Sequence, residues 1–237
     1  MNAAELRALR DDLHRPVTEV GVETTEGDQF GPRGWYPAGP PARANQTYEL
    51  YFRIDVDVEG NTLRLSKQRH HDDPYDGVFL PYSAGVCPRV DLTRAATNIV
   101  VSAWFSGCTF VKCTSRVPVP PTFGQAAPNI DNQSAVVAHN YSQGREDDEN
   151  YDRRLRNLRD ACNAAFLDVF ETSPARRAAF DKANLFSAAA TDGMVIGTLV
   201  NNQWQWDWLT SEITAPNTGH IYDWFQIPAL DWRSLAY

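Results

Sequence analysis

The feature that most constrains the fold is a hairpin pattern in the first third of the chain. Residues 48–58 are hydrophobic mainly at every second position, a Glu-Gly-Asn turn follows at 59–61, and residues 62–67 alternate again. Side chains along a strand point alternately to opposite faces, so this alternation is typical of strands with one buried face. Two such runs joined by a short turn predict an antiparallel β-hairpin.

Further runs rich in β-branched and aromatic residues extend the strand pattern along the chain. They predict a buried strand, a bend and a second element within 99–111, and strands at 134–141, within 194–208 and at 221–227. Asn201 and Asn202 interrupt the third of these runs, and Asn tolerates the backbone conformation that a tight hairpin turn requires. The chain is therefore expected to contain several paired strands.

Three segments predict helices. Residues 2–14 place Leu6, Leu9 and Leu13 on one helical face. Residues 147–170 keep apolar side chains at helical spacing with Arg and Asp on the other faces. Ser173 and Pro174 are typical of an N-cap and a first helical residue, so a third helix is expected to end near 185.

Two segments rich in turn-forming residues are expected to be loops within one domain. Gly, Pro and Arg dominate residues 27–44, and four prolines lie in an insertion at 117–132, which would connect two core elements. We expect residues 1–237 to form a single catalytic domain of the mixed α/β (α+β) class. Its strands would form a central mixed β-sheet or a β-sandwich flanked by helices.

The charge of the chain limits its partners. The formal net charge is −8 and the sequence pI is about 5.1, whereas nucleic acids and anionic membranes require clustered Lys and Arg. Neither is expected as the main partner. No run reaches the length of a membrane span, and the N-terminus has no signal-peptide pattern. The four cysteines lack CxxC spacing and are expected to be reduced thiols.

One cysteine has the surroundings expected of a nucleophile. Ser106 and Gly107 precede Cys108, and a small pair lets the backbone bend sharply and approach a substrate. The backbone N–H groups of Cys108 and Gly107 are candidate oxyanion donors. His139 lies in a strand-like apolar run and is the histidine best placed to act as a base. The alternative is that both residues are ordinary core packing.

The segment Phe105-Ser106-Gly107-Cys108 resembles the LSGC signature of the catalytic domain of cytotoxic necrotizing factor and the Burkholderia lethal factor toxins. It is also similar to the cysteine motif of bacterial chemoreceptor deamidases. In that superfamily the histidine follows on a later strand, as His139 does here, and some branches have Thr six positions before the cysteine, where this chain has Ser102. The sequence departs from the pattern in Phe105, in Ser102 and in a longer Cys-to-His interval.

The resemblance implies a cysteine-dependent protein glutamine deamidase with a fold like that catalytic domain. Cys108 would attack a glutamine side chain, His139 would transfer protons, and Ser102 would orient His139. No cofactor or metal is implied. The expected partner is a host protein with a reactive glutamine, such as a signalling GTPase or a translation factor. The protein would be a bacterial toxin or effector, secreted or injected into the host cytoplasm without a classical signal peptide.

Several other interpretations of the sequence stay open. The same Cys and His pair would serve a cysteine protease or a transglutaminase. Trp204, Trp206 and Trp208 alternate, which indicates a core or an interface, or a non-catalytic binding module if the indoles are exposed. Residues 70–73 (His-His-Asp-Asp) are better explained as a solvated loop than as a metal site. The acidic residues at 146–149 are best explained by stabilisation of a helix N-terminus.

Overall fold

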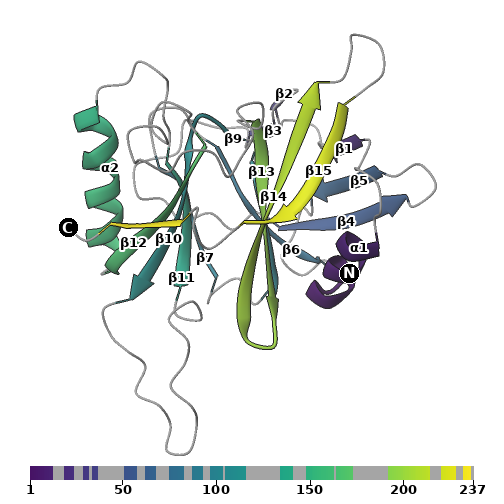
Figure 1. The fold of residues 1–237 in the computed structure, drawn as a ribbon, viewed down its shortest axis with the longest axis horizontal. Helices are drawn as coiled ribbons and strands as arrows, with labels where there is room; N and C mark the ends of the chain where they lie inside the picture. The colour runs from purple at the N-terminus through teal and green to yellow at the C-terminus, as the bar shows by residue number, and fades with distance from the viewer. Residues whose placement is uncertain are drawn as a thin grey trace, which may run out of the picture.

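The computed structural model describes most of the predicted elements. The residues that it describes are 1–12, 19–23, 29–31, 34–36, 51–57, 62–67, 75–82, 87–92, 97–103, 105–115, 134–140, 148–162, 164–172, 192–213, 220–227 and 232–235. Two helices and two large sheets make up this part of the chain (Figure 1). The fold is therefore of the α+β class, as the sequence predicts.

The larger sheet contains nine strands among the described residues. They are β1 (Glu19–Glu23), β4 (Tyr51–Asp57), β5 (Thr62–Lys67), β6 (Gly77–Leu80), β8 (Ile99–Ser102), β9 (Phe105–Ser106), β13 (Asp192–Val200), β14 (Gln203–Ile213) and β15 (His220–Gln226). Their order is β1-β5-β4-β6-β8-β13-β14-β15, and β9 pairs with β13 beyond the end of β8. The pairs β1–β5 and β6–β8 are parallel and the others antiparallel, so the sheet is mixed.

The smaller sheet has five antiparallel strands in the order β16-β12-β10-β11-β7. They are β7 (Arg89–Asp91), β10 (Thr109–Ser115), β11 (Ser134–Asn140), β12 (Ala164–Glu171) and β16 (Trp232–Leu235). Thus β10, which begins directly after Cys108, pairs with β11, which carries His139. A third, two-stranded sheet pairs β2 (Gln29–Gly31) with β3 (Gly34–Tyr36).

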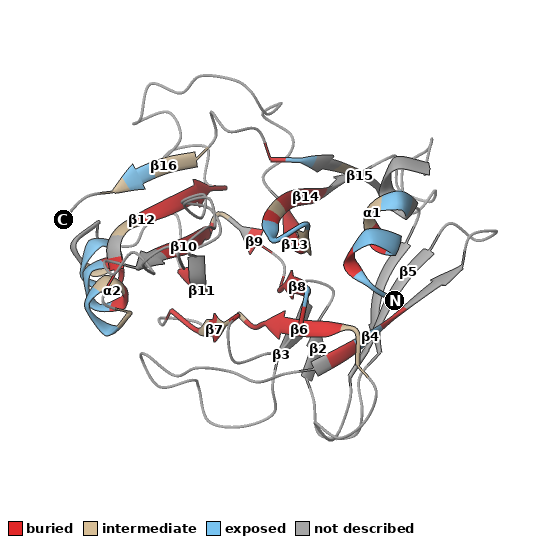
Figure 2. Ribbon diagram, turned by 90° about the horizontal axis from the view of Figure 1, so that it is seen from below, coloured by how far each residue is buried: buried red, intermediate tan, exposed pale blue. Residues whose placement is uncertain are grey.

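Three apolar clusters build the molecule in layers. One cluster packs α1 (Ala3–Asp12) on the larger sheet through Leu6, and another packs α2 (Asp148–Ala161) on the smaller sheet. The third lies between the sheets and takes side chains from both, including Trp208 and Phe110. In Figures 1 and 2 the helices lie at opposite ends of this arrangement, and buried residues line the strands between them. Two sheets packed face to face bury one face of each strand.

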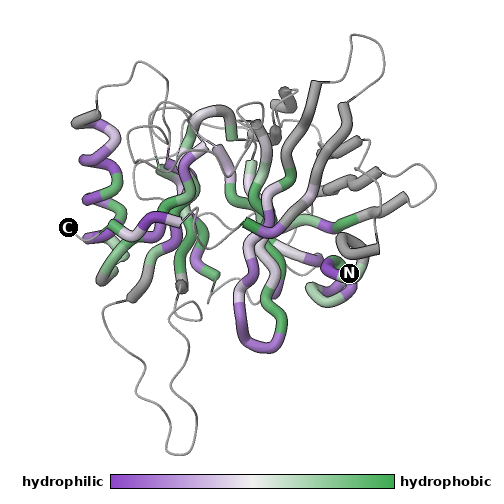
Figure 3. Tube along the Cα trace, in the orientation of Figure 1, coloured by the Kyte–Doolittle hydropathy of each residue, from purple (hydrophilic) through white to green (hydrophobic). Residues whose placement is uncertain are grey.

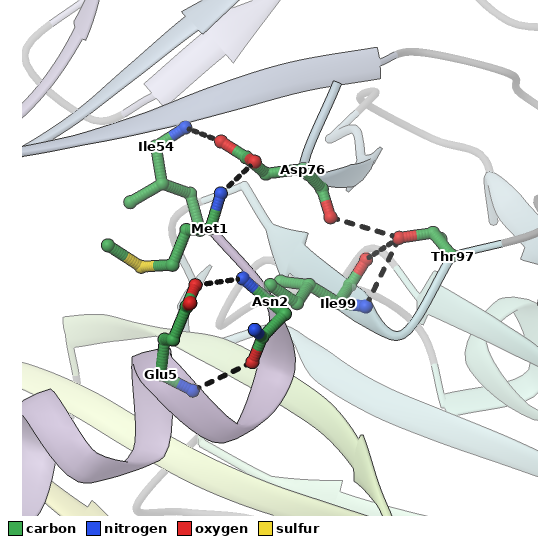
Figure 4. A network of polar contacts seen from close by, with 7 residues as sticks. All are labelled: Met1, Asn2, Glu5, Ile54, Asp76, Thr97 and Ile99. Atoms are coloured by element: carbon green, nitrogen blue, oxygen red, sulfur yellow. Dashed lines mark hydrogen bonds and ion pairs between the residues drawn. The ribbon is translucent and has the colours of Figure 1, made fainter. Parts of the chain in front are cut away.

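The N-terminus of α1 is attached to the larger sheet by polar contacts (Figure 4). Asn2 and Glu5 form a reciprocal cap, in which Glu5 N–H donates to Asn2 Oδ1 at 2.9 Å and Asn2 N–H donates to Glu5 Oε2 at 2.7 Å. The Met1 amine forms an ion pair with Asp76, whose other oxygen accepts from Ile54 N–H at 2.7 Å. These bonds fix the first helix against β4.

Several predicted elements are confirmed with small shifts in their ends. The hairpin of residues 48–67 is β4 and β5, and β8, β9 and β10 are the strand, bend and second element of 99–111. Asn201 and Asn202, with φ of 53° and 60°, form the β13–β14 turn, which is hydrophilic in Figure 3. α1 is the predicted N-terminal helix, and β11 and β15 match two further predicted strands.

The prediction of one helix over 147–170 is wrong in its second half. α2 ends at Ala161, and the residues from Ala164 to Glu171 form β12 in the middle of the smaller sheet. Both faces of this strand are covered, because Phe170 packs between the sheets and Val169 packs toward α2. A strand buried on both faces lacks alternation, so its apolar residues were compatible with helical spacing.

The segment 27–44 is not entirely loop, because it contains the β2–β3 pair. Phe30 pairs with Trp35, and aromatic residues favour strands even among Gly and Pro. The insertion at 117–132, the helix expected after Ser173 and the cluster at 70–73 lie outside the described residues. No helix in the described part of the chain is both long and apolar enough to cross a membrane.

Candidate functional site

Cys108 lies at a bend directly before β10. The preceding residue, Gly107, has φ of +83°, in the left-handed region that favours glycine, and a Cβ built on it would have no heavy atom of the described residues within 4 Å apart from its chain neighbours. The bend therefore borders open space. The carbonyl of Cys108 accepts hydrogen bonds from Thr172 N–H at 3.3 Å and from Thr172 Oγ1 at 2.6 Å. These two bonds hold the backbone of Cys108 against the residue that follows β12.

The side chain of Cys108 packs in the apolar cluster between the two sheets, and 4% of the residue is exposed. Phe110, two residues further along the chain, belongs to the same cluster. None of the four cysteines forms a disulfide, so Cys108 is a thiol, as expected from the sequence. Cys108, the candidate nucleophile, is therefore buried, although it directly follows the bend at Gly107.

His139 lies on β11, directly opposite Phe110 on β10. Directly opposite residues of paired strands share one face of the sheet, so His139 projects toward the cluster that contains Cys108. Its ring stacks on Phe105, with centroids 3.8 Å apart and an interplanar angle of 17°, and forms a T-shaped contact with Tyr82, with centroids 5.4 Å apart. The fold thus gathers the predicted base and the FSGC segment in one place.

The imidazole of His139 is buried without polar partners. The residue is 1% exposed, and among the described residues neither Nδ1 nor Nε2 has a hydrogen-bond partner. Burial lowers its pKa from 6.5 to about 3, because the charged form loses its hydration. The ring is therefore neutral at pH 7. A buried polar group without a partner costs free energy, and the indole nitrogens of Trp206 and Trp208 share this state; His139 differs from them because an imidazole can take up a proton.

The structure does not contain the two hydrogen bonds expected of a formed catalytic site. Since both ring nitrogens of His139 lack partners, the imidazole is hydrogen-bonded neither to the Cys108 thiol nor to the Ser102 hydroxyl. Ser102 is buried at the end of β8, and its Oγ accepts from Val195 N–H at 2.8 Å. Val195 lies between the residues of β13 that pair with β8 and those that pair with β9. The hydroxyl of Ser102 therefore provides a partner for the Val195 amide, which is a structural role.

A buried polar network on the opposite face of the smaller sheet lies behind the candidate site, and the sequence analysis missed it. The carboxylate of Glu171 accepts from Thr109 Oγ1 at 2.8 Å and from Tyr151 OH at 3.1 Å, and the two hydroxyls are 2.9 Å apart. Arg154 Nε donates to Asn140 Oδ1 at 3.0 Å. Thr109 and Asn140 are the neighbours of Cys108 and His139 in the chain. The network thus ties both strands to α2, although nothing in the sequence distinguished Glu171.

Burial decides one of the alternatives from the sequence, and the position of α2 is compatible with the preferred explanation of another. Trp204, Trp206 and Trp208 are buried in the cluster between the sheets, so the stripe is core. Asp148 and Glu149 lie in the first turn of α2, where acidic side chains are favourable. Within the described residues, no group of three His, Cys, Asp or Glu side chains is arranged to hold a metal ion.

The sequence matches no protein-family model, and no curated protein is similar enough to it to count as a relative.

Proposed function

We propose that this protein is a cysteine-dependent glutamine deamidase in which Cys108 is the nucleophile and His139 the general base. The observation that carries the proposal is the buried, unpartnered imidazole of His139, which projects into the cluster that holds the Cys108 thiol. Unlike the unpartnered indoles of the same cluster, a neutral imidazole can take a proton from a thiol, which is the task that we assign to His139. The resemblance of Phe105-Ser106-Gly107-Cys108 to the deamidase motif supplies the choice of reaction.

The reaction would begin with a neutral Cys108 thiol and a neutral His139 imidazole. In the substrate complex His139 takes the Cys108 proton as the sulfur attacks the side-chain carbonyl of glutamine. Backbone N–H groups of Gly107 and Cys108 would face the developing oxyanion, since the left-handed bend leaves room beside them. The imidazolium then protonates the departing ammonia, and water hydrolyses the thioester to glutamate. The negative charge that forms beside the ring raises the pKa of His139 during the reaction.

The proposal places the Cys108 to His139 contact in the substrate complex, because catalytic hydrogen bonds often tighten only when substrate binds. It gives no orienting role to Ser102, because the described residues show no hydrogen bond between its hydroxyl and either ring nitrogen of His139. Access to the imidazole would pass Tyr82, a partly buried ring in T-shaped contact with His139. Displacement of Tyr82 by the substrate would expose the site, so we expect that Tyr82→Ala raises the reactivity of Cys108 toward small alkylating reagents.

The substrate would be a protein of the host cell, and a signalling GTPase or a translation factor is the class that the resemblance suggests. The protein would act there as a toxin or effector. The net charge of −8 favours a target with a neutral or basic surface.

The test is to incubate cell extract with the wild-type protein and with Cys108→Ser, and then to compare peptides by mass spectrometry. Deamidation adds about 1 Da to a glutamine peptide and leaves the chain whole, whereas a protease creates new termini and a transglutaminase incorporates an added amine. Cys87→Ser is the matched control, because Cys87 is also a buried thiol. We expect new glutamates with wild type and Cys87→Ser but not with Cys108→Ser. Identical glutamine patterns in all samples would contradict the proposal.

A further inference from the structure

A second cysteine site lies on the far side of the smaller sheet, where α2 packs. Cys162 follows the last residue of α2, and its N–H donates to the Leu158 carbonyl at 3.0 Å. Its side chain is partly exposed and packs against the apolar cluster that contains Cys113 of β10. The two thiols are hydrogen-bonded to each other. A partly exposed cysteine therefore lies beside a buried one.

A cation completes this site. Arg89 of β7 donates from Nη1 to Cys162 Sγ at 3.6 Å. The hydrogen bond from Cys113 and then the charge of Arg89 lower the pKa of Cys162 to about 7, against the effects of burial and of Asp91, which raise it. The carbonyl end of α2 also opposes a thiolate. The pKa of Cys113 is raised well above its ordinary value, consistent with Cys113 keeping the shared proton.

We propose that Cys162 is a peroxide-sensitive modification site and that Cys113 is its resolving cysteine. Three features meet in one place: a partly exposed cysteine, a guanidinium that donates to its sulfur, and a second thiol hydrogen-bonded to it. Cys87, the other buried cysteine of this cluster, lacks this activation, since burial raises its pKa to about 12. The proposal does not depend on Cys108 being catalytic.

The reaction takes two balanced steps with hydrogen peroxide as the oxidant. The Cys162 thiolate attacks one peroxide oxygen, an S–O bond forms, the O–O bond breaks, and the departing hydroxide takes up a proton to leave as water. The sulfur is oxidised by two electrons to a sulfenic acid. The Cys113 sulfur then attacks Cys162, the S–S bond forms, and the hydroxyl group leaves as water with the proton of Cys113. The product is a disulfide that joins β10 to the end of α2.

The experiment treats the folded full chain with hydrogen peroxide, alkylates the remaining thiols and maps cysteine peptides by mass spectrometry. We expect a Cys113–Cys162 disulfide in the wild type, in Cys108→Ser and in Cys87→Ser. In Cys113→Ser, a dimedone adduct should accumulate on Cys162, because its sulfenic acid has no partner to resolve it. No disulfide in the wild type, or a disulfide that joins Cys162 to Cys87, would overturn the proposal.

A second variant tests the role of the cation. Arg89→Gln keeps a polar side chain but removes the charge, so the fraction of Cys162 present as thiolate at pH 7 should fall. We expect the rate of disulfide formation to drop about fivefold, because a rise of about one unit in the pKa of Cys162 from about 7 lowers the thiolate fraction at pH 7 from about one half to about one tenth. Arg89→Lys should retain most of the rate. An unchanged rate in Arg89→Gln would show that the guanidinium does not activate this sulfur.

Discussion

Replacement of His139 by Phe tests whether the buried imidazole is kept at a cost in stability. The substitution retains a flat ring between Phe105 and Tyr82 but removes two polar atoms that have no hydrogen-bond partner. Each unsatisfied buried group costs about 1–3 kcal/mol, and the larger ring costs about 1–3 kcal/mol through overpacking. Removing both nitrogens therefore gains about 2–6 kcal/mol and the larger ring offsets about 1–3 of it, so at pH 7 we expect the free energy of unfolding of His139→Phe to lie between about 1 kcal/mol below that of the wild type and about 5 kcal/mol above it.

Lower pH should separate the two proteins further. Burial lowers the pKa of His139 from 6.5 to about 3, so between these values the unfolded chain binds a proton that the folded chain does not. The wild type therefore loses stability as pH falls from 6.5 toward 3, by up to about 1.4 kcal/mol per pH unit. Phe cannot titrate, so by pH 4 the advantage of His139→Phe should have grown by roughly 3 kcal/mol.

The assay is urea denaturation, followed by tryptophan fluorescence and circular dichroism, at several pH values between 7 and 4. His139→Gln is the control, because it also cannot titrate but keeps polar atoms at the site. It should share the flatter pH dependence of His139→Phe without the gain in stability at pH 7. If His139→Phe instead lost more than about 2 kcal/mol at pH 7 and kept the wild-type pH dependence, the imidazole would be a structural residue and the reasoning would be refuted.

Two further predictions concern the core. Gly197→Ala should lower the free energy of unfolding by about 1–3 kcal/mol or more, because its Cβ would lie 2.3 Å from Trp206 Cζ3. In Gly107→Ala the added Cβ meets no described atom, so the left-handed φ alone should lower the free energy of unfolding by about 1–2 kcal/mol. Equal losses for Gly197→Ala and Gly107→Ala in urea titrations would contradict the packing explanation. Lys112→Met leaves the buried Asp168 carboxylate, 3.8 Å from Nζ in the wild type, without its cation and should cost about 3–5 kcal/mol. The double variant with Lys112→Met and Asp168→Leu should recover much of this loss, as measured by thermal unfolding. If the double variant were no more stable than Lys112→Met, the unpaired charge would not be the cause.

The predictable parts of the fold are those in which local chemistry and burial agree. The β4–β5 hairpin alternates because one of its faces is covered, as Phe52 and Ile54 in the cluster beneath α1 indicate. Asn201 and Asn202 marked the β13–β14 turn because they accept positive φ. The boundary between α2 and β12 was not predictable in this way, since a strand covered on both faces has no period-2 signal.

The candidate site was predictable only as single residues. The FSGC segment and the apolar context of His139 indicated two groups, and the β10–β11 pairing brings their strands together. The pairing of distant strands depends on the whole fold, so the network of Glu171, Thr109 and Tyr151 had no local signal. Likewise, no spacing in the sequence connects Cys162 with its partners.

The most direct test of the central claim follows the oxygen of water into the product. In cell extract made with oxygen-18 water, a thioester on Cys108 that is opened by water should give glutamates about 3 Da heavier than the parent glutamines. The account predicts these heavy peptides with the wild type and with Cys162→Ser, and none above background with Cys108→Ser. Heavy glutamates at the same sites and yields with Cys108→Ser would contradict the assignment of Cys108 as the nucleophile.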